Sequence, residues 1–247
     1  MAVRGLVFLL ASLAGWLSAL PASWVVRHVP LPESLRVRQV EGPWWQGHAN
    51  LRWRNEVVGQ VSWQLRGVSW LWGRPSVAFN WRQGDRNRMA AHAVLSAWSG
   101  EIRLKDVSGD LALVPLLRWA GQPPLAEGRL RIDHLDVTLH ARPHWWPTET
   151  VAKGVLINGN VAGLRLPDTL NWQLDQSGAD QLLALKAQGQ VSRGRLSLSA
   201  HLARDGAWQA QVSLHDAPNP PGAWRTLLRS QGEGRWSGTF SGRVTLP

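Results

Sequence analysis

Apolar and polar side chains alternate residue by residue through much of this sequence. The segment LSLSAHL at 196–202 places an apolar residue at every second position, and WQAQVSL at 208–214 does the same. Asp205-Gly206 lies between the two segments, and both residue types tolerate the positive φ that a tight hairpin turn requires. Residues 51–53, 61–65 and 77–81 follow the same pattern. The sequence therefore predicts a mainly β fold of antiparallel hairpins with one apolar face.

Two departures from strict alternation add detail to this fold. Between 128 and 141 the apolar phase slips by one residue, which predicts a β-bulge that bends the strand. PLLRWAG at 115–121 and PGAWRTLLRSQG at 221–232 each begin with proline and end at glycine, the residues that favour a helix start and a helix stop. We expect one short helix in each of these two segments.

The chain contains two similar halves. Gly47 and Gly154 each open a strand-like segment, and the tripeptide WQL occurs at 63–65 and again at 172–174. AWSGEIRLKD from Ala97 matches AWQAQVSLHD from Ala207. Because these matches keep the same order, we interpret residues 44–147 and 148–247 as diverged β repeats of one architecture. We expect Trp63 to correspond to Trp172, and Trp98 to Trp208.

A long uncharged segment precedes the β region. Residues 5–26 carry no charged side chain. This segment is about as long as a helix that crosses a bilayer. A signal peptide cleaved after Ala22 is the alternative, but its apolar core would be shorter. We expect residues 1–27 to form an uncleaved transmembrane anchor, with 28–43 as a linker. The N-terminus would lie inside the cell and the bulk of the chain would be exported.

The composition limits the classes of site. The chain has no cysteine, which excludes disulfides, thiol nucleophiles and thiolate metal sites. Lys and Arg number 27 against 17 Asp and Glu, but the cations are scattered singly along strands. This scatter favours a solvated strand face over a nucleic-acid groove. The chain has 17 Trp, three Phe and no Tyr, so its large apolar anchors must be mostly indoles.

The segment VEGPWWQG at 40–47 places Trp44 and Trp45 just before a predicted strand. The two indoles could cover the end of a sheet, contact a membrane interface, or form a ligand platform. A structural role is favoured because Trp145 and Trp146 precede the corresponding strand of the second half. If the segment is extended, neighbouring side chains alternate, and we expect Trp45 to be buried and Trp44 to be exposed.

The sequence favours neither catalysis nor cofactor binding. It contains no HExxH, G-x-S-x-G or phosphate-binding loop motif. His140 and His144 lie four residues apart near Asp133 and Asp136, but in strand or loop context. Zinc needs three or four convergent ligands, and no spacing here supplies them. We therefore expect no enzyme activity, no cofactor and no metal site.

The ordered motifs resemble the protein N family of the bacterial type II secretion system. The resemblance rests on V-x-G-x-x-W-x-G at 40–47, on W-x-L at 63–65, and on INGNVAGLRLP and WRTLLRSQGEGRW further along the chain. It implies a single-pass protein of the Gram-negative inner membrane with a β-rich periplasmic domain. The implied partners are other inner-membrane platform proteins of this machine and the outer-membrane secretin. The residues that we expect to carry the structural and interaction motif are Gly42, Trp44, Trp45, Gly47, Trp63, Leu65, Gly154, Trp172 and Trp208.

Two functions remain open at this level. The first is a non-catalytic component that docks to secretion proteins, and the second is a periplasmic groove that binds or transfers lipids. The second rests on an architectural analogy only. The apolar sheet face distinguishes them, because an open trough would suit a lipid and a covered face would be core. The residues expected on that face are Trp63, Phe79, Trp98, Leu196, Leu198, Trp208 and Val212.

Overall fold

The computed structural model describes most of the chain in separate segments. The described residues are 19–28, 35–54, 56–67, 73–96, 101–119, 123–124, 126–140, 147–161, 164–177, 182–191, 194–203, 205–218, 220 and 222–243. The helices among them are α2 (Ala22–His28), α3 (Leu113–Trp119) and α4 (Gly222–Leu227). The strands are β1 (Leu35–Glu41), β2 (Gln46–Trp53), β3 (Glu56–Arg66), β4 (Ser76–Gln83), β5 (Asn87–Ser96), β6 (Glu101–Ala112), β7 (Ala126–His140), β8 (Pro147–Val161), β9 (Leu164–Arg165), β10 (Thr169–Ser177), β11 (Leu182–Val191), β12 (Gly194–Leu202), β13 (Ala207–His215), β14 (Arg229–Gly232) and β15 (Arg235–Arg243).

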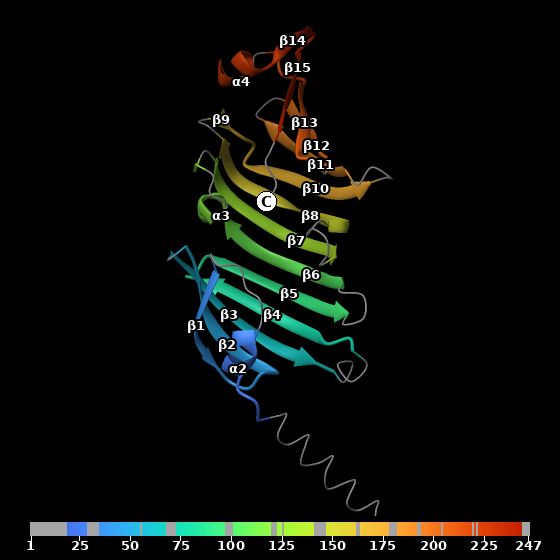
Figure 1. The fold of residues 1–247 in the computed structure, drawn as a ribbon. Helices are drawn as coiled ribbons and strands as arrows, with labels where there is room; N and C mark the ends of the chain where they lie inside the picture. Colours follow the sequence, from blue (N-terminus) through green and yellow to red (C-terminus); the bar gives the residue numbers. More distant parts are fainter. Residues whose placement is uncertain are drawn as a thin grey trace, which may run out of the picture.

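All strands of the described residues join one sheet, in which neighbours pair antiparallel. The order follows the chain from β1 to β13 and then runs through β15 to β14, while β9 pairs only with β8. Figure 1 shows the strands crossing the long axis of an elongated, curved sheet, with α2 near one end and α4 at the other. This confirms the mainly β, antiparallel fold that the alternation predicts.

Cross-strand pairing sorts the side chains of this sheet onto two different faces. When directly opposed residues are followed from strand to strand, one such row contains only apolar residues and glycine. The row formed by the residues next to them along each strand is mostly polar. Because directly opposed residues share a face, the sheet has one apolar and one polar surface. The apolar row is Ala49, Val61, Trp81, Met89, Gly109, Ile132, Gly154, Trp172, Ala187, Leu198, Val212 and Gly238. The polar row is Asn50, Gln60, Arg82, Arg88, Asp110, Arg131, Val155, Asn171, Gln188, Ser197, Ser213 and Ser237.

Two short helices pack against the apolar face and create two buried clusters. Leu116 and Trp119 of α3 contact a cluster of Trp81, Leu111 and Ile132. The rings of Trp81 and Trp119 meet edge to face, with centroids 5.8 Å apart and planes at 87°. In the second half, α4 contributes the buried Trp224, which packs with Leu228 against a cluster that includes Leu170, Leu196 and Leu214.

Several local predictions are confirmed. The hairpin at Asp205-Gly206 joins β12 and β13, and Gly206 has φ +81°. The predicted bulge lies in β7, where the pairing with β8 shifts between Ile132 and His134. The first predicted helix corresponds to α3, which begins two residues earlier, at Leu113.

The second helix, predicted for residues 221–232, is shorter in the structure than in the prediction. Helix α4 ends at Leu227, and the remaining residues form strand β14, which pairs with β15. The buried Leu228 packs in the apolar cluster, and Gly232 then adopts φ +84° in the turn to β15. Tertiary pairing of this segment therefore outweighs its local helix signal.

The predicted anchor lies largely outside the described residues. In the part of the chain that the structure describes, no helix is long and apolar enough to span a bilayer. The last residues of the predicted anchor form the seven-residue helix α2, and β1 lies within the range that the sequence assigns to a linker. Residues 20–22 contact the sheet, since Pro21 forms a β-bridge with Pro43.

Candidate functional site

The tryptophan motif at 42–47 forms the turn between β1 and β2. Gly42 has φ +96°, and a Cβ there would lie 2.6 Å from the backbone oxygen of Gln46. This turn holds two neighbouring segments through its backbone. The N–H of Trp44 donates to the oxygen of Leu20 (3.0 Å), and the oxygen of Trp45 accepts from the N–H of Leu65 (2.6 Å). The motif thus connects the N-terminal segment to the first strands of the sheet.

Trp63 covers the strand that follows this turn. It lies directly opposite Gly47 on the neighbouring strand, and a Cβ on Gly47 would come within 2.6 Å of the Trp63 Cζ2 atom. The indole Nε1 of Trp63 donates to the backbone oxygen of Trp44 (3.0 Å). Glycine at 47 is therefore required for close approach of the indole to the backbone, and the indole in turn fixes the motif turn.

The same pairing occurs twice more in the described residues. Trp172 lies opposite Gly154, where a Cβ would come within 2.7 Å of the Trp172 Cζ2 atom. Trp208 lies opposite Gly242, where a Cβ would come within 2.8 Å of the Trp208 Nε1 atom. In each case an indole covers a glycine across the strand pair, which compensates for the missing side chain.

The expected burial of Trp44 and Trp45 is wrong. The side chain of Trp45 is 37% exposed, whereas Trp44 is half-buried. The prediction assumed an extended chain, but both residues lie in a turn after Gly42, so strand alternation does not apply to them. Trp98 and the pair Trp145 and Trp146 lie outside the described residues, as does His144.

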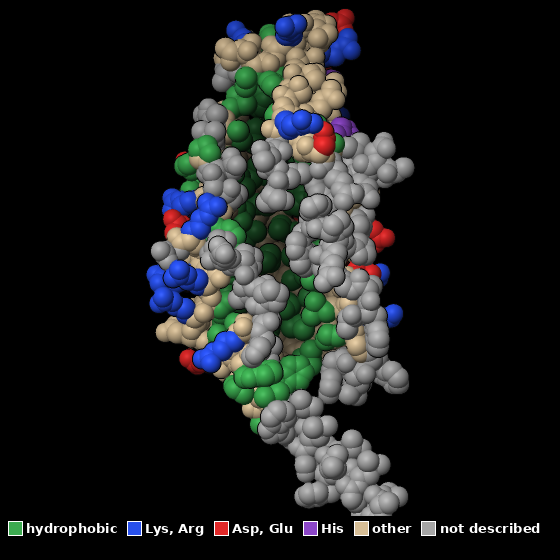
Figure 2. Space-filling view, in the orientation of Figure 1, with side chains coloured by type: hydrophobic (Ala, Val, Ile, Leu, Met, Phe, Trp, Pro, Cys, Tyr) green, Lys and Arg blue, Asp and Glu red, His purple; other side chains and the backbone are tan. Residues whose placement is uncertain are grey.

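The apolar face forms a groove along the molecule. We call the concave surface along the twelve-residue apolar row the apolar groove, and Figure 2 shows its green side chains lining a hollow that runs lengthwise. Of the residues expected on this face, the six that the structure describes share it. Leu196 is buried in the cluster beneath α4. The other five are only partly buried, and they are Trp63, Phe79, Leu198, Trp208 and Val212.

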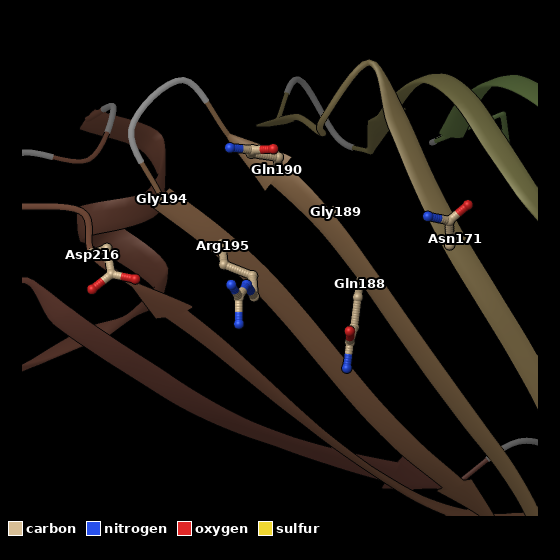
Figure 3. Close-up of a pocket in the computed structure, with 7 residues that line it drawn as sticks. All are labelled: Asn171, Gln188, Gly189, Gln190, Gly194, Arg195 and Asp216. Atoms are coloured by element: carbon tan, nitrogen blue, oxygen red, sulfur yellow. The ribbon is translucent and has the colours of Figure 1, made fainter.

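The polar face carries hollows without a recognisable catalytic arrangement among the described residues. One of about 420 Å³ is lined by side chains from β10, β11 and β12 and by Asp216, which follows β13. Figure 3 shows its amides, Asn171, Gln188 and Gln190, together with Arg195 and Asp216. A separate hollow of about 490 Å³ includes Asp110, whose buried carboxylate lies between arginine side chains, with Arg129 and Arg131 each 3.7 Å from Oδ1. These groups can bind polar or anionic groups, but they supply no nucleophile–base pair.

A small cluster of cation-binding groups also lies on the polar face. One ligand atom from each of Asp106, His134 and Asp136 lies within 4.8 Å of the others. The backbone N–H of Asp106 donates to Asp136 Oδ1 (2.7 Å). These three exposed or half-exposed side chains could hold a divalent cation. Sequence spacing did not reveal the trio, because its members come from β6 and β7 and a backbone kink at Asp106 (φ +52°) brings them together.

Comparison with known proteins decides the family. The family model for type II secretion system protein N matches residues 33–242, which is most of the chain. The chain belongs to the protein N family of the type II secretion system. A type II secretion system protein N from Aeromonas hydrophila is 38% identical over 152 residues, which cover 54% of this chain and 59% of that protein. One from Vibrio cholerae serotype O1 is 27% identical over 131 residues, which cover 52% of each chain.

The resemblance to the protein N family is therefore confirmed. The matches span between about half and three-fifths of the length of these curated relatives. No solved structure is significantly similar to the chain.

Proposed function

We propose that this protein is a non-catalytic component of the type II secretion machinery that acts by docking to other secretion proteins. The observation that supports this role most directly is the family match over residues 33–242. The proposed partners are other inner-membrane platform proteins and the periplasmic part of the secretin. Among the described residues the sheet runs as an open series of strands from β1 to the pair of β15 and β14, and the end of such a sheet suits docking.

The proposed docking surface is the outer edge of β15. Strand β14 pairs only with Arg235–Ser237 of this strand, so among the described residues Thr239–Arg243 have a strand partner, β13, on one side only. An edge strand presents unpaired backbone N–H and C=O groups, and partner proteins commonly bind such an edge by adding a strand. Thr239 and Ser241 are exposed on the sheet face beside this edge, so an analogue at either position lies close to a bound partner strand.

Site-specific photo-crosslinking in secreting cells tests this role. A photoreactive phenylalanine analogue in place of Thr239 should yield adducts with another secretion protein. The matched control is the same analogue at Gln188, which is exposed in the middle of the sheet on β11. Adducts at Gln188 with none at Thr239 would refute docking at this edge. Absence of secretion-protein adducts from a wider set of surface positions would refute the docking role itself.

We further propose that residues 1–27 anchor the protein in the inner membrane, with the sheet in the periplasm. Two observations support a position of this end of the sheet at a membrane surface. Trp24 on α2 is 52% exposed and Trp45 is 37% exposed, and both belong to the end of the sheet that receives the N-terminal segment. Exposed indoles favour the headgroup region of a bilayer. Carbonate extraction should leave the protein in the membrane with an intact N-terminus, whereas a soluble product beginning at Ser23 would refute the anchor.

The proposal also includes an origin of the sheet from two repeats, 44–147 and 148–247. The support is geometric. The pairs Gly47–Trp63 and Gly154–Trp172 have the same cross-strand relation, and a short helix packs on the apolar face in each half. An experimental structure that places Trp98 and Trp208 on strands with different positions within their halves would contradict this origin.

A further inference from the structure

The apolar groove is long and continuous. Its row of twelve apolar or glycine residues crosses from β2 to β15 without a polar side chain. At the usual strand spacing this row extends over about 50 Å, which exceeds the hydrocarbon thickness of a bilayer, about 30 Å. Several of its side chains are only partly buried, including Val61, Met89, Leu198 and Val212. Other members of the row, Ala49, Trp81, Ile132 and Ala187, are buried, so the partly exposed side chains lie between buried ones. Partly exposed apolar side chains on a concave surface are typical of a binding surface.

The described residues cover only part of this groove. Helix α3 connects β6 to β7, helix α4 connects β13 to β14, and both helices pack over one side of the groove. No second sheet is present among the described residues. Figure 2 shows the green floor as a hollow beside a rim of described residues on its left. Leu196 and Leu214 are fully buried under α4, so the open part of the floor lies away from that helix.

One rim of the groove carries arginines. In an antiparallel sheet whose strands follow chain order, alternate connections lie on the same side. The connections after β2, β4, β6 and β8 therefore share a rim, and each contributes an exposed arginine. Figure 2 shows Lys and Arg side chains along the left side of the hollow. We call this set the arginine rim, and its members are Arg54, Arg86, Arg118 and Arg165.

We propose that the apolar groove binds anionic phospholipid, with its acyl chains on the floor and its headgroup phosphate at the arginine rim. Guanidinium groups bind phosphate with paired hydrogen bonds, and they favour anionic headgroups over neutral ones. The inference is independent of the docking role, which uses the sheet edge.

A lipid fits this floor better than a polypeptide does. Apart from Gly238 at the edge of β15, each floor residue belongs to a strand that is paired on both sides, so this part of the floor has no backbone groups to satisfy those of a bound peptide. A peptide buried there would lose hydrogen bonds to water without replacement, which costs several kcal/mol per group by transfer scales. Acyl chains carry no polar groups, so their burial involves no such loss.

Photo-crosslinking of the full-length protein in cells grown with radioactive phosphate tests the inference. The photoreactive analogue at Val61 or Val212 faces the groove, and at Gln60 or Gln211 it faces the polar surface one residue away. We expect phosphate-labelled protein, carrying a phospholipid adduct by mass spectrometry, from the two groove positions several-fold above the two controls. Strand β13 lies far along the sheet from α2, so an adduct at Val212 does not arise from the predicted anchor.

Variants of the arginine rim test headgroup selectivity. Combined Arg54→Gln, Arg86→Gln and Arg118→Gln should reduce the share of anionic lipid among the groove adducts several-fold and leave zwitterionic adducts in place. Equal labelling on both faces, or protein adducts without phosphate at Val61 and Val212, would overturn the proposal. Fatty-acid adducts without phosphate would also overturn it. Secretion-protein adducts at Thr239 are scored separately, so either proposal can fail alone.

Discussion

The indole of Trp172 lies across the backbone of Gly154 on the adjacent strand. A Cβ at position 154 would come within 2.7 Å of Cζ2 and 2.9 Å of Cε2 of that indole, and still closer to the backbone oxygen of Arg131. Gly154 is buried, and it lies in the middle of the sheet where β7, β8 and β10 meet. The indole therefore packs directly on the backbone of Gly154, and no space remains for a larger residue at position 154.

Substitution Gly154→Ala should destabilise the protein by about 1–3 kcal/mol, as expected when a methyl group is forced into a packed site. Urea unfolding of the full chain in detergent would measure the change. Gly222→Ala is the matched control, since a Cβ there meets nothing within 4 Å. Similar free energies of unfolding for the two variants would show that the close approach of Trp172 is absent in solution.

Trp63→Phe should cost more stability than Trp45→Ala, although the second change removes more atoms. Trp63→Phe removes the hydrogen bond from Nε1 to the oxygen of Trp44 and should cost about 1 kcal/mol. Trp45→Ala affects a partly exposed indole in a turn and should cost less than about 1 kcal/mol. Thermal unfolding of both variants checks this order. A larger loss for Trp45→Ala would mean that this indole is buried in the native protein.

Residues 19–29 should contribute to the stability of the sheet. Ala22 is 1% exposed, its N–H donates to the oxygen of Gly42 (3.0 Å), and Trp44 donates to Leu20. A fragment starting at Ala19 should be more stable than one starting at Pro30 by about 1–3 kcal/mol, from two hydrogen bonds at about 0.5–1.5 kcal/mol each. Chemical unfolding of both fragments measures the difference. Equal stability would show that this segment is not bound to the sheet.

The hairpin between β12 and β13 should show a specific pH dependence. The backbone N–H of Ala207 and then the guanidinium of Arg243 lower the pKa of Asp205 below its ordinary value. The folded state thus favours the ionised carboxylate, which stabilises the protein above the ordinary Asp pKa of about 4 and is lost as the pH falls through the lowered value. Asp205→Asn should lower the unfolding midpoint at pH 7 and have little effect in strong acid. A difference that grows on acidification would contradict this assignment.

The sequence predicted those features that depend on local chemistry. Asp205-Gly206 specifies its hairpin because both residues suit a turn, and the one-residue slip in 128–141 directly indicates a bulge. Both signals lie within a few neighbouring residues. Gly47 does lie at the start of β2, but Gly154, which the sequence also places at a strand start, lies in the middle of β8. The pairing of these glycines with Trp63 and Trp172 required the register of the sheet.

Features that depend on distant strands could not be predicted in this way. The segment after α4 has a helical pattern, but β15 offers it hydrogen-bond partners that the local sequence does not reveal. The trio of Asp106, His134 and Asp136 depends on how two strands are aligned. The exposure of Trp45 depends on Gly42, whose positive φ turns the chain where strand alternation was assumed.

From β1 to β8 each strand of the sheet pairs with the one before it, so this part of the sheet can change length in units of one hairpin. Adding or deleting two consecutive strands would alter the groove by about 10 Å, at the usual strand spacing. Each remaining connection would stay on its original rim, because strand direction is restored after every second strand. Removing a single strand would instead move every later connection to the opposite side. Relatives of different length within this family should therefore differ by even numbers of strands.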